Sequence, residues 1–455
     1  MVPYRIWIGI MIVWAALMGF IFLGHFQMSI LAMMYKERTR NSTRNMASFD
    51  VIGPRYNWTL KQEGQLISAF YYGLTIMSFP GGILADLVGP FKTILVTYSL
   101  MTIVTTIAVP VSGHNWIPLF VCRFITGLCA GPSTPCLMSL IAKWAPPKEK
   151  SIFMCCILGF TFGTLVTPPI SSIIIIHLGW EWSFYLTSIV GVLFVVAWFI
   201  LVSDYPIDNW FCSKEEATFI NDSLEGTVVK GWMKPPIWQM LKSVPFIIVV
   251  LAHYGVVSGL FLVVVLLPKF LDDAMQFDLL KIGDITAIPG SGIVVAGIIY
   301  GSVVGYVTKK YDFDKKYLRK GLVIFSHLLP GIFLMSFLLT FLFEFGENLV
   351  IGLLVIATIC TAAAMVTTTM NPQDLAPNFA GTQIGIMGLF GSTAGFIYPA
   401  ILVELTKEKN DIRQWSILLS IIGVVYLFTG FLFIIFGTTD IQPWNEKRST
   451  IQLTS

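Results

Sequence analysis

Twelve apolar segments, each long enough to cross a lipid bilayer, constrain this 455-residue chain more than any other feature. A helix needs about 20 apolar residues to span ~30 Å of hydrocarbon, and its backbone polar groups must be satisfied internally. Charged residues make up only 12% of the chain, and the two-residue alternation of a membrane barrel is absent. We therefore expect an all-α membrane protein. The segments lie at 6–34, 64–87, 93–111, 117–141, 151–176, 182–202, 244–271, 285–307, 322–342, 349–370, 381–402 and 417–434.

A long polar interruption divides the segments into two sets of six. Within it, Ser213 precedes a short charged stretch in the manner of a helix N-cap. Ala145-Pro146 recurs as Ala376-Pro377 at the same offset at which Pro168 recurs as Pro399. Two six-helix halves of this kind resemble the parallel repeats of the major facilitator fold. The expected parts are a first bundle at 1–203 with an extracellular or lumenal loop at 35–62, a cytoplasmic linker at 204–243, a second bundle at 244–438 and a cytoplasmic tail at 439–455.

Basic residues concentrate on one side of the predicted spans. The segment between spans eight and nine holds Lys309, Lys310, Lys315, Lys316, Arg319 and Lys320. Loops on the opposite side are acidic, so the positive-inside rule places both termini in the cytoplasm. The first long loop, although basic, then lies outside, with glycosylation sequons at Asn41 and Asn57. A third sequon, at Asn221, lies in the linker and is expected to stay unmodified.

Arg123 is the only formal charge in the span at 117–141. A cation inside a spanning helix costs at least ~2.5–3.5 kcal/mol unless a partner or cavity receives it. The planar guanidinium matches a carboxylate or phosphate, so one hypothesis is an anion-binding group in a membrane pore. The other is that Arg123, which lies near one end of the span, reaches back to the lipid headgroups. Position alone favours the first hypothesis slightly.

The loop between spans two and three fits the facilitator loop signature. Its glycine, aspartate, glycine and basic residue are Gly82, Asp86, Gly89 and Lys92. Glycines let helix ends approach closely, and Asp86 can meet a helix N-terminus or a cation at the inner face. We expect a conformational role for these four residues, in holding the outward-open state, and not substrate binding.

Three strings carry a closer resemblance. They are Arg123-Phe124-Ile125-Thr126-Gly127-Leu128, Trp144-Ala145-Pro146-Pro147-Lys148-Glu149-Lys150-Ser151 and Asn371-Pro372-Gln373-Asp374-Leu375-Ala376-Pro377. They resemble the anion:cation symporter family, which includes sodium–phosphate cotransporters, sialin and vesicular glutamate transporters. The resemblance extends from span two to the C-terminus. It implies a twelve-helix major facilitator fold, a small anionic substrate and a coupling cation, Na⁺ or H⁺.

The chain departs from that family at four positions. Leu23 stands where the family usually has an arginine, and Val256 stands where glutamate carriers have one. Ile67 stands where the glutamate branch has a histidine, and Ala130 replaces a common span-four glutamate. Arg123 is thus the anion-binding arginine that remains. We expect that the protein is not a vesicular glutamate transporter and that coupling does not run through a span-four carboxylate.

Five further residues are candidates for the substrate site. His25 lies deep in span one and is either an anion contact or a histidine bonded to a neighbouring helix. His253 lies on span seven near Ser258-Gly259, where a helix break is expected. Tyr71 and Tyr72 lie in the middle of span two, and one is expected to face the cavity. Thr134, in the Gly131–Pro135 break of span four, is a ligand contact or a kink filler.

Gating is the expected role of a further set. Pro168 and Pro399 interrupt spans five and eleven, which are also rich in glycine and can cross closely. Asn371 and Asp374 of the third string are assigned to the same conformational group. Packing alone is the alternative for each of them.

No catalytic motif or P-loop is present, so an enzyme or primary pump is disfavoured. We expect a secondary active transporter of small organic anions or inorganic phosphate, coupled to Na⁺ or H⁺. The alternative is a non-transporting or weakly coupled sensor on the same fold. We expect no cofactor, no metal and no nucleic acid, and a monomer in the plasma membrane or in a lysosomal or vesicular membrane.

Overall fold

The computed structural model describes residues 3–34, 52–113, 115–146, 149, 153, 155–224, 235–311, 315–341, 343, 346–376, 379–407 and 411–445. Asn41 lies outside these residues, and the side chain of Asp86 is outside the description too. Within the described residues, twelve helices are long and apolar enough to cross a membrane. The prediction of an all-α membrane protein with twelve spans is confirmed.

The spans form two sets of six, separated by the linker. The first set is α1 (Tyr4–Met33), α2 (Leu60–Leu87), α3 (Pro90–Ser112), α4 with α5 (Trp116–Ala130, Ser133–Trp144), η1 with α7 (Cys156–Leu158, Gly159–Leu178) and α8 (Trp180–Leu201). The second set is α11, η3 and α12 (Val244–Phe261, Leu262–Leu266, Leu267–Asp273), α13 (Leu279–Lys310), α14, η4, α15 and η5 (Lys315–Val323, Ile324–Leu328, Leu329–Met335, Ser336–Phe341), α16 with η6 (Glu347–Cys360, Thr361–Val366), α18 with α19 (Ala380–Gly391, Ala394–Leu405) and α20 (Ile412–Phe436). Shorter helices are η2 (Pro206–Asp208), α9 (Lys214–Leu224), α10 (Ile237–Lys242), α17 (Asn371–Leu375) and η8 (Pro443–Asn445).

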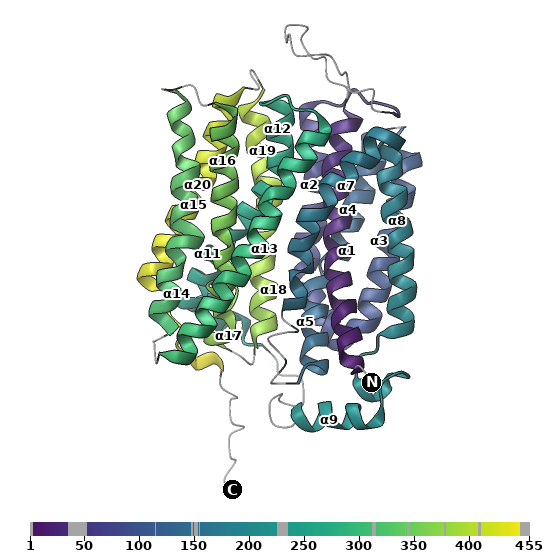
Figure 1. The fold of residues 1–455 in the computed structure, drawn as a ribbon, viewed down its shortest axis with the longest axis vertical. Coiled ribbons are helices and arrows are strands. Elements are labelled where there is room, and N and C mark those ends of the chain that lie inside the picture. The colour runs from purple at the N-terminus through teal and green to yellow at the C-terminus, as the bar shows by residue number, and fades with distance from the viewer. Residues whose placement is uncertain are drawn as a thin grey trace.

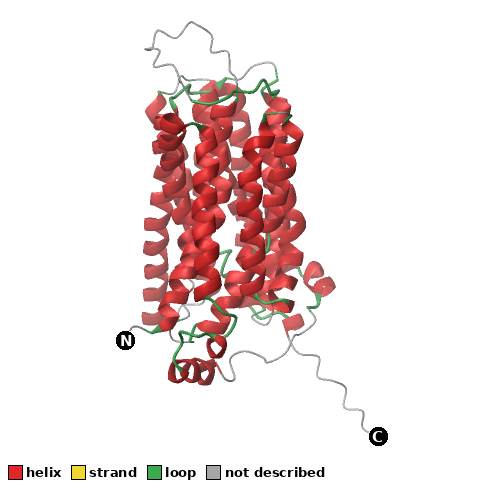
Figure 2. Cartoon of the chain, turned by 90° about the vertical axis from the view of Figure 1, so that its right-hand side faces the viewer, coloured by secondary structure: helices red, strands yellow, loops and turns green. Residues whose placement is uncertain are grey.

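The two sets stand side by side as two halves of one upright bundle, purple to teal in the first and green to yellow in the second (Figure 1). The described residues nearest the two termini, at the start of α1 and in η8, lie at the same end of the bundle, and α9 lies across that end (Figures 1 and 2). We call this the terminal end and the opposite end the far end. α2 begins and α12 finishes at the far end (Figure 1).

Apolar packing is distributed unequally between the two ends. One cluster of buried side chains in the far part joins both halves and includes Phe70 and Tyr71 from the first half with Phe261 and Tyr398 from the second. Toward the terminal end the core separates into two clusters. One belongs to the first half and contains Trp198, whereas most of the other belongs to the second half. The halves therefore share a core at the far end and have largely separate cores at the terminal end.

The linker is tied to the first half at the terminal end. The backbone N–H of Glu216 donates to Ser213 Oγ at 3.2 Å, which confirms the predicted N-cap of α9. The guanidinium of Arg5 at the start of α1 pairs with Glu216 at 3.0 Å and with Glu149 at 2.8 Å. The hydrogen bonds from Arg5 hold the pKa of Glu149 below its ordinary value.

Candidate functional site

Arg123 is buried inside the first half, with 3% of its surface exposed. Nη1 donates to the carbonyl of Phe22 on α1 at 3.1 Å. The guanidinium carbon lies 4.1 Å from the ring centroid of Phe26 and 5.1 Å from that of Phe70. Nε and Nη2 have no hydrogen-bond partner, and no carboxylate of the described residues lies within ion-pair distance. The site therefore contains a cation with two donor nitrogens, Nε and Nη2, that make no hydrogen bond.

Close packing of α2 on α4 places Arg123 there. A Cβ on Gly127 would lie 1.9 Å from the carbonyl oxygen of Phe70, and one on Gly73 would lie 2.2 Å from that of Phe124. Only glycine allows two backbones to approach so closely. Gly127 follows Arg123 by one helical turn, so this crossing presses the arginine against the aromatic ring of Phe70.

His25 lies on α1, three residues after Phe22, whose carbonyl accepts a hydrogen bond from Arg123. Its ring packs edge-on against Phe184 at 4.7 Å, and Nδ1 has no hydrogen-bond partner. Gln27, two residues on, is 3% exposed with an unpartnered Nε2. Buried polar groups without partners are rare in folded proteins. This stretch of α1, which also supplies Phe22 and Phe26 to Arg123, therefore holds further buried polar atoms without partners.

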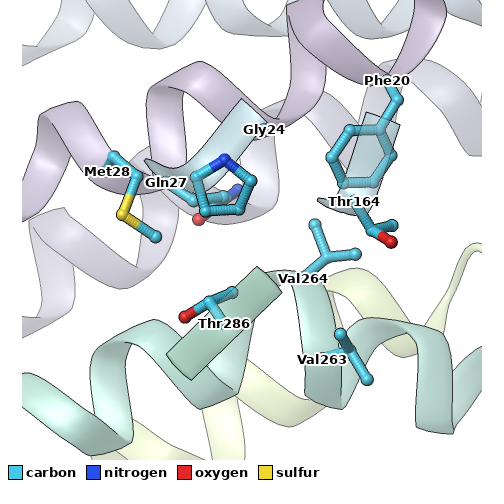
Figure 3. Close-up of a pocket in the computed structure, with 9 residues that line it drawn as sticks. Phe20, Gly24, Gln27, Met28, Thr164, Val263, Val264 and Thr286 are labelled. Carbon is cyan, nitrogen blue, oxygen red and sulfur yellow. The ribbon is translucent and has the colours of Figure 1, made fainter. Parts of the chain in front are cut away.

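Gln27 lines a small pocket between the two halves (Figure 3). Thr164 on α7 and Thr286 on α13 supply its other polar side chains, while Phe20 and Val264 are among its apolar walls. Gln27, Thr164 and Thr286 were not predicted as site residues from the sequence. Uncharged polar residues in apolar helices were the available signal, but many such residues simply bond to their own helix, as Thr286 also does at 2.7 Å.

Tyr71 and Tyr72 both meet the second half. The Tyr71 ring lies 5.2 Å from that of Phe261, and a Cβ on Gly395 would lie 2.0 Å from Tyr71 Cγ. The Tyr72 ring lies 4.8 Å from that of Phe396. The two tyrosines lie at the contact between α2 and α19, and neither lines the pocket of Figure 3.

Thr134 lies on the other side of the helix break that the sequence predicts. α4 ends at Ala130 and α5 begins at Ser133, so the break is present. At ~1.5 Å per residue, Thr134 is roughly 16 Å along the helix axis from Arg123. The structure therefore does not bring the two side chains together on one small ligand.

His253 is partly buried on α11 and packs against α18, since a Cβ on Gly391 would lie 3.4 Å from its ring. Its Nδ1 has no partner. His327 differs, because its ring bonds both Ser326 Oγ at 2.8 Å and the carbonyl of Ala252 at 3.0 Å. The expected break at Ser258-Gly259 is displaced: α11 continues to Phe261, and the π-helical η3 follows it.

In the loop between α2 and α3, Gly89 has a φ of 95°, which favours glycine. The carboxylate of Asp204 occupies the space beside it and accepts a hydrogen bond from the backbone N–H of Phe91 at 2.9 Å. Asp204, which was not predicted from the sequence, is therefore an acid at the N-terminus of α3. Gly82 has open space where a Cβ would be, and Lys92 is exposed.

The prolines assigned to gating lie at contacts between the halves. The carbonyl of Pro168 on α7 faces Gly283 of α13, and that of Pro399 on α19 faces Gly64 of α2. Asn371 and Asp374 instead lie inside the second half. Asn371 donates to the carbonyl of Thr438 at 3.0 Å, and Asp374 pairs with Arg319 at 2.6 Å.

One ion pair between the halves was not predicted from the sequence. Glu63 on α2 and Lys269 on α12 form an ion pair of 2.6 Å. The available signals were a lysine inside the predicted span at 244–271 and an acid directly before the predicted span at 64–87. Of the sequons, Asn57 is exposed near the far end and Asn221 is exposed on α9.

Comparison with known proteins finds relatives that are all membrane transporters. The chain is 27% identical to sialin of Ovis aries over 86% of this chain and 78% of that protein. It is 29% identical to a putative inorganic phosphate cotransporter of Drosophila melanogaster, over 88% of this chain and 77% of that protein. Sodium-dependent phosphate transport protein 1 of Rattus norvegicus is 24% identical, over 94% of this chain and 92% of that protein. These relatives confirm the resemblance to the anion:cation symporter group.

The fold agrees with these relatives. The inward-open xylose transporter XylE of E. coli superposes with a TM-score of 0.67 at 15% identity, covering 95% of this chain and 96% of that one. The relatives and the fold are those of membrane transporters rather than enzymes. The model of the Major Facilitator Superfamily matches residues 15–399, and the chain belongs to that superfamily.

Proposed function

We propose that this transporter carries small organic anions or inorganic phosphate by alternating access, coupled to Na⁺ or H⁺, with Arg123 as the main anion-binding group. The supporting observation is the buried guanidinium with Nε and Nη2 unpartnered. An unpaired charge inside a membrane bundle is costly, and an anion in the pore would offset that cost. His25, His253, Tyr71, Tyr72 and Thr134 are proposed to surround the route that the anion takes.

Similarity to relatives supports the substrate class. Two of them are named for phosphate, one as a putative inorganic phosphate cotransporter and one as a sodium-dependent phosphate transport protein. A guanidinium can pair two oxygens of either a carboxylate or a phosphate. This leaves organic anions and phosphate as one chemical class for the site.

The orientation and the parts of the chain are proposals as well. We infer that the terminal end faces the cytoplasm, which leaves Asn41 and Asn57 on the glycosylated side, and that the protein works as a monomer. The two bundles are proposed to end at residues 203 and 438, and the linker at residue 243. Gly82, Asp86, Gly89, Lys92, Pro168, Pro399, Asn371 and Asp374 are proposed to govern the movement between the halves.

The test is uptake of radiolabelled phosphate, sialate and glutamate by proteoliposomes under imposed pH, sodium and voltage gradients. Arg123→Ala is expected to abolish uptake, because losing a buried charge-assisted contact costs roughly 2–5 kcal/mol of binding. Arg123→Lys should restore uptake only in part, since lysine keeps the charge but not the planar fork. Arg413→Lys, at an exposed position of α20, is the control. Folded Arg123→Ala protein with unchanged apparent affinity would contradict the proposal.

A further inference from the structure

An ion pair is buried between the two halves at the far end. Lys269 Nζ donates to Glu63 Oε1 at 2.6 Å and lies 3.1 Å from Asp273 Oδ2. The side chains of Glu63, Asp273 and Lys269 are 0%, 3% and 9% exposed. Lys269 and Asp273 are both on α12, whereas Glu63 is on α2. The contact from Lys269 to Glu63 therefore joins elements that must separate when the far end opens.

Glu63 is not fully satisfied by this contact, because Oε2 is buried without a hydrogen-bond partner. Its surroundings are mostly apolar. Next to it on α2, Gly64 faces Val403 of α19, and Leu402 and Thr406 line the same pocket as Lys269. Burying an ion pair costs more desolvation than it usually returns. Ionisable groups kept inside spanning helices are therefore candidates for function.

Other charged groups near Glu63 are few among the described residues. Asp272 on α12 is 9% exposed, and Lys61 on α2 is exposed. At the end of α19, Glu404 and Lys407 pair with each other at the surface. The described end of α1 carries no charge. Lys269 is the cation in direct contact with Glu63 in this closed arrangement.

Opening of the far end changes that balance. Lys269 and Asp273 are four residues apart on one helix and stay together when α12 moves. Glu63 stays on α2 and loses its cation. When the far end is open, the Glu63 carboxylate therefore lacks a positive partner. A cation from the solution on the far side can take that place.

We propose that Glu63 is a binding site for a monovalent cation, H⁺ or Na⁺, that takes the place of Lys269 and stabilises the far-open state. This assignment deepens the proposed cation-coupled function and rests on it. For H⁺, one proton passes from far-side water to the Glu63 carboxylate. For Na⁺, the two carboxylate oxygens are ligands. Because Lys269 and the cation exclude each other, far-side cation shifts the population toward the far-open state.

The experiment measures the distance between spin labels at Asn57 and Lys407, two exposed far-end positions in opposite halves. Full-length protein in nanodiscs is compared at neutral and acidic pH, and in sodium and choline. Acid or sodium should increase the far-open population several-fold, and the cation that acts identifies the ligand. Glu63→Gln, which carries no charge, should be largely far-open and should respond to neither cation.

Two further variants sharpen the result. Lys269→Gln removes the competing cation, so its response should appear at a lower cation concentration than in the wild type. If a charge left alone prevents folding, Glu63→Gln with Lys269→Met removes both charges and should be folded and unresponsive. Glu347→Gln is the matched control, because it removes a far-end carboxylate that pairs with Lys281 at the surface. Its response should be that of the wild type.

The proposal is overturned if Glu63→Gln responds as the wild type does, or if the wild type responds to neither acid nor sodium. The readout needs no transported anion. Arg123→Ala should keep the cation response, so a failure of anion transport and a failure of this site give different results.

Discussion

The far and terminal ends of the bundle differ in how tightly the two halves meet. On α13, a Cβ on Gly283 or Gly290 would lie 2.4 Å from atoms of α7, yet one on Gly301, closer to the terminal end, meets nothing within 4 Å. The span made of α18 and α19 repeats the pattern. A Cβ on Gly395 would be 2.0 Å from Tyr71, whereas one on Gly385 would be 3.9 Å from Phe79. The structure is therefore closed at the far end and looser at the terminal end.

The ion pairs follow the same division. At the terminal end, Arg5 pairs with Glu149 in the first half, and Arg319 pairs with Asp374 in the second. At the far end, Lys269 pairs across the halves. Pairs inside one half can persist while the halves rock, whereas a pair across them must break. The difference indicates that the Arg5 and Arg319 pairs stabilise one half each, whereas the Lys269–Glu63 pair takes part in the conformational change.

The largest effect is expected for Gly395→Ala. The added methyl group overlaps the ring of Tyr71, so α2 and α19 must separate at the contact that closes the far end. Overpacking of a tight contact costs ~1–3 kcal/mol, or up to about 100-fold in the balance of states. The measurement is the far-open population, from the same pair of spin labels, together with anion uptake.

Gly385→Ala is the control for that change, since its methyl group has room beside Phe79. It should leave both the population and uptake near wild type. Equal effects of the two substitutions would mean that the halves are packed equally tightly at the two ends.

A smaller effect is expected for Thr75→Val. The hydroxyls of Thr75 on α2 and Ser392 next to α19 share a hydrogen bond of 2.7 Å across the halves. A net contribution of ~0.5–1.5 kcal/mol predicts a shift of about two- to tenfold toward the far-open state. The double variant with Ser392→Ala should add little more, and clearly additive shifts measured with the same labels would show that the hydroxyls act separately.

The smallest effect concerns the terminal end. The pKa of Glu149 is held below its ordinary value by the hydrogen bonds from Arg5. The resulting stability is therefore fully present above the unfolded pKa of ~4.3 and is lost as the pH falls through the lower folded pKa. Because the Glu149 side chain is 34% exposed, Glu149→Gln should cost less than ~1 kcal/mol.

Thermal unfolding followed from neutral to acidic pH measures this contribution. The wild type should lose its advantage over Glu149→Gln only in the acidic range. A change in the far-open population on Glu149→Gln would count against a role confined to the first half.

The sequence predicts the fold far better than the site. Spanning length alone is enough to locate all twelve helices, because lipid requires each segment to satisfy its own backbone. Ser213 and the Gly131–Pro135 break are equally local signals, and both are present in the structure. Arg123 was found because a charge in an apolar segment is conspicuous.

Contacts between distant segments carry no such local signal. Lys269 and Glu63 are 206 residues apart, one on each side of the linker, so their pairing appears only in three dimensions. Asp204 accepts from the N-terminus of α3 because the chain after α8 returns to the start of that helix. The pattern of one segment also cannot tell whether a threonine such as Thr286 lines a pocket or only caps a turn.

The π-helical η3 determines the direction in which the Lys269 side chain points from α12. A π turn holds one more residue than an α turn, and each residue advances a helix by about 100°. Leu262–Leu266 lies just before α12, so it sets the rotational phase of everything that follows on that helix. Deleting one of its valines would leave the span apolar. It would also rotate Lys269 about the helix axis by more than a quarter turn, away from Glu63 in the other half.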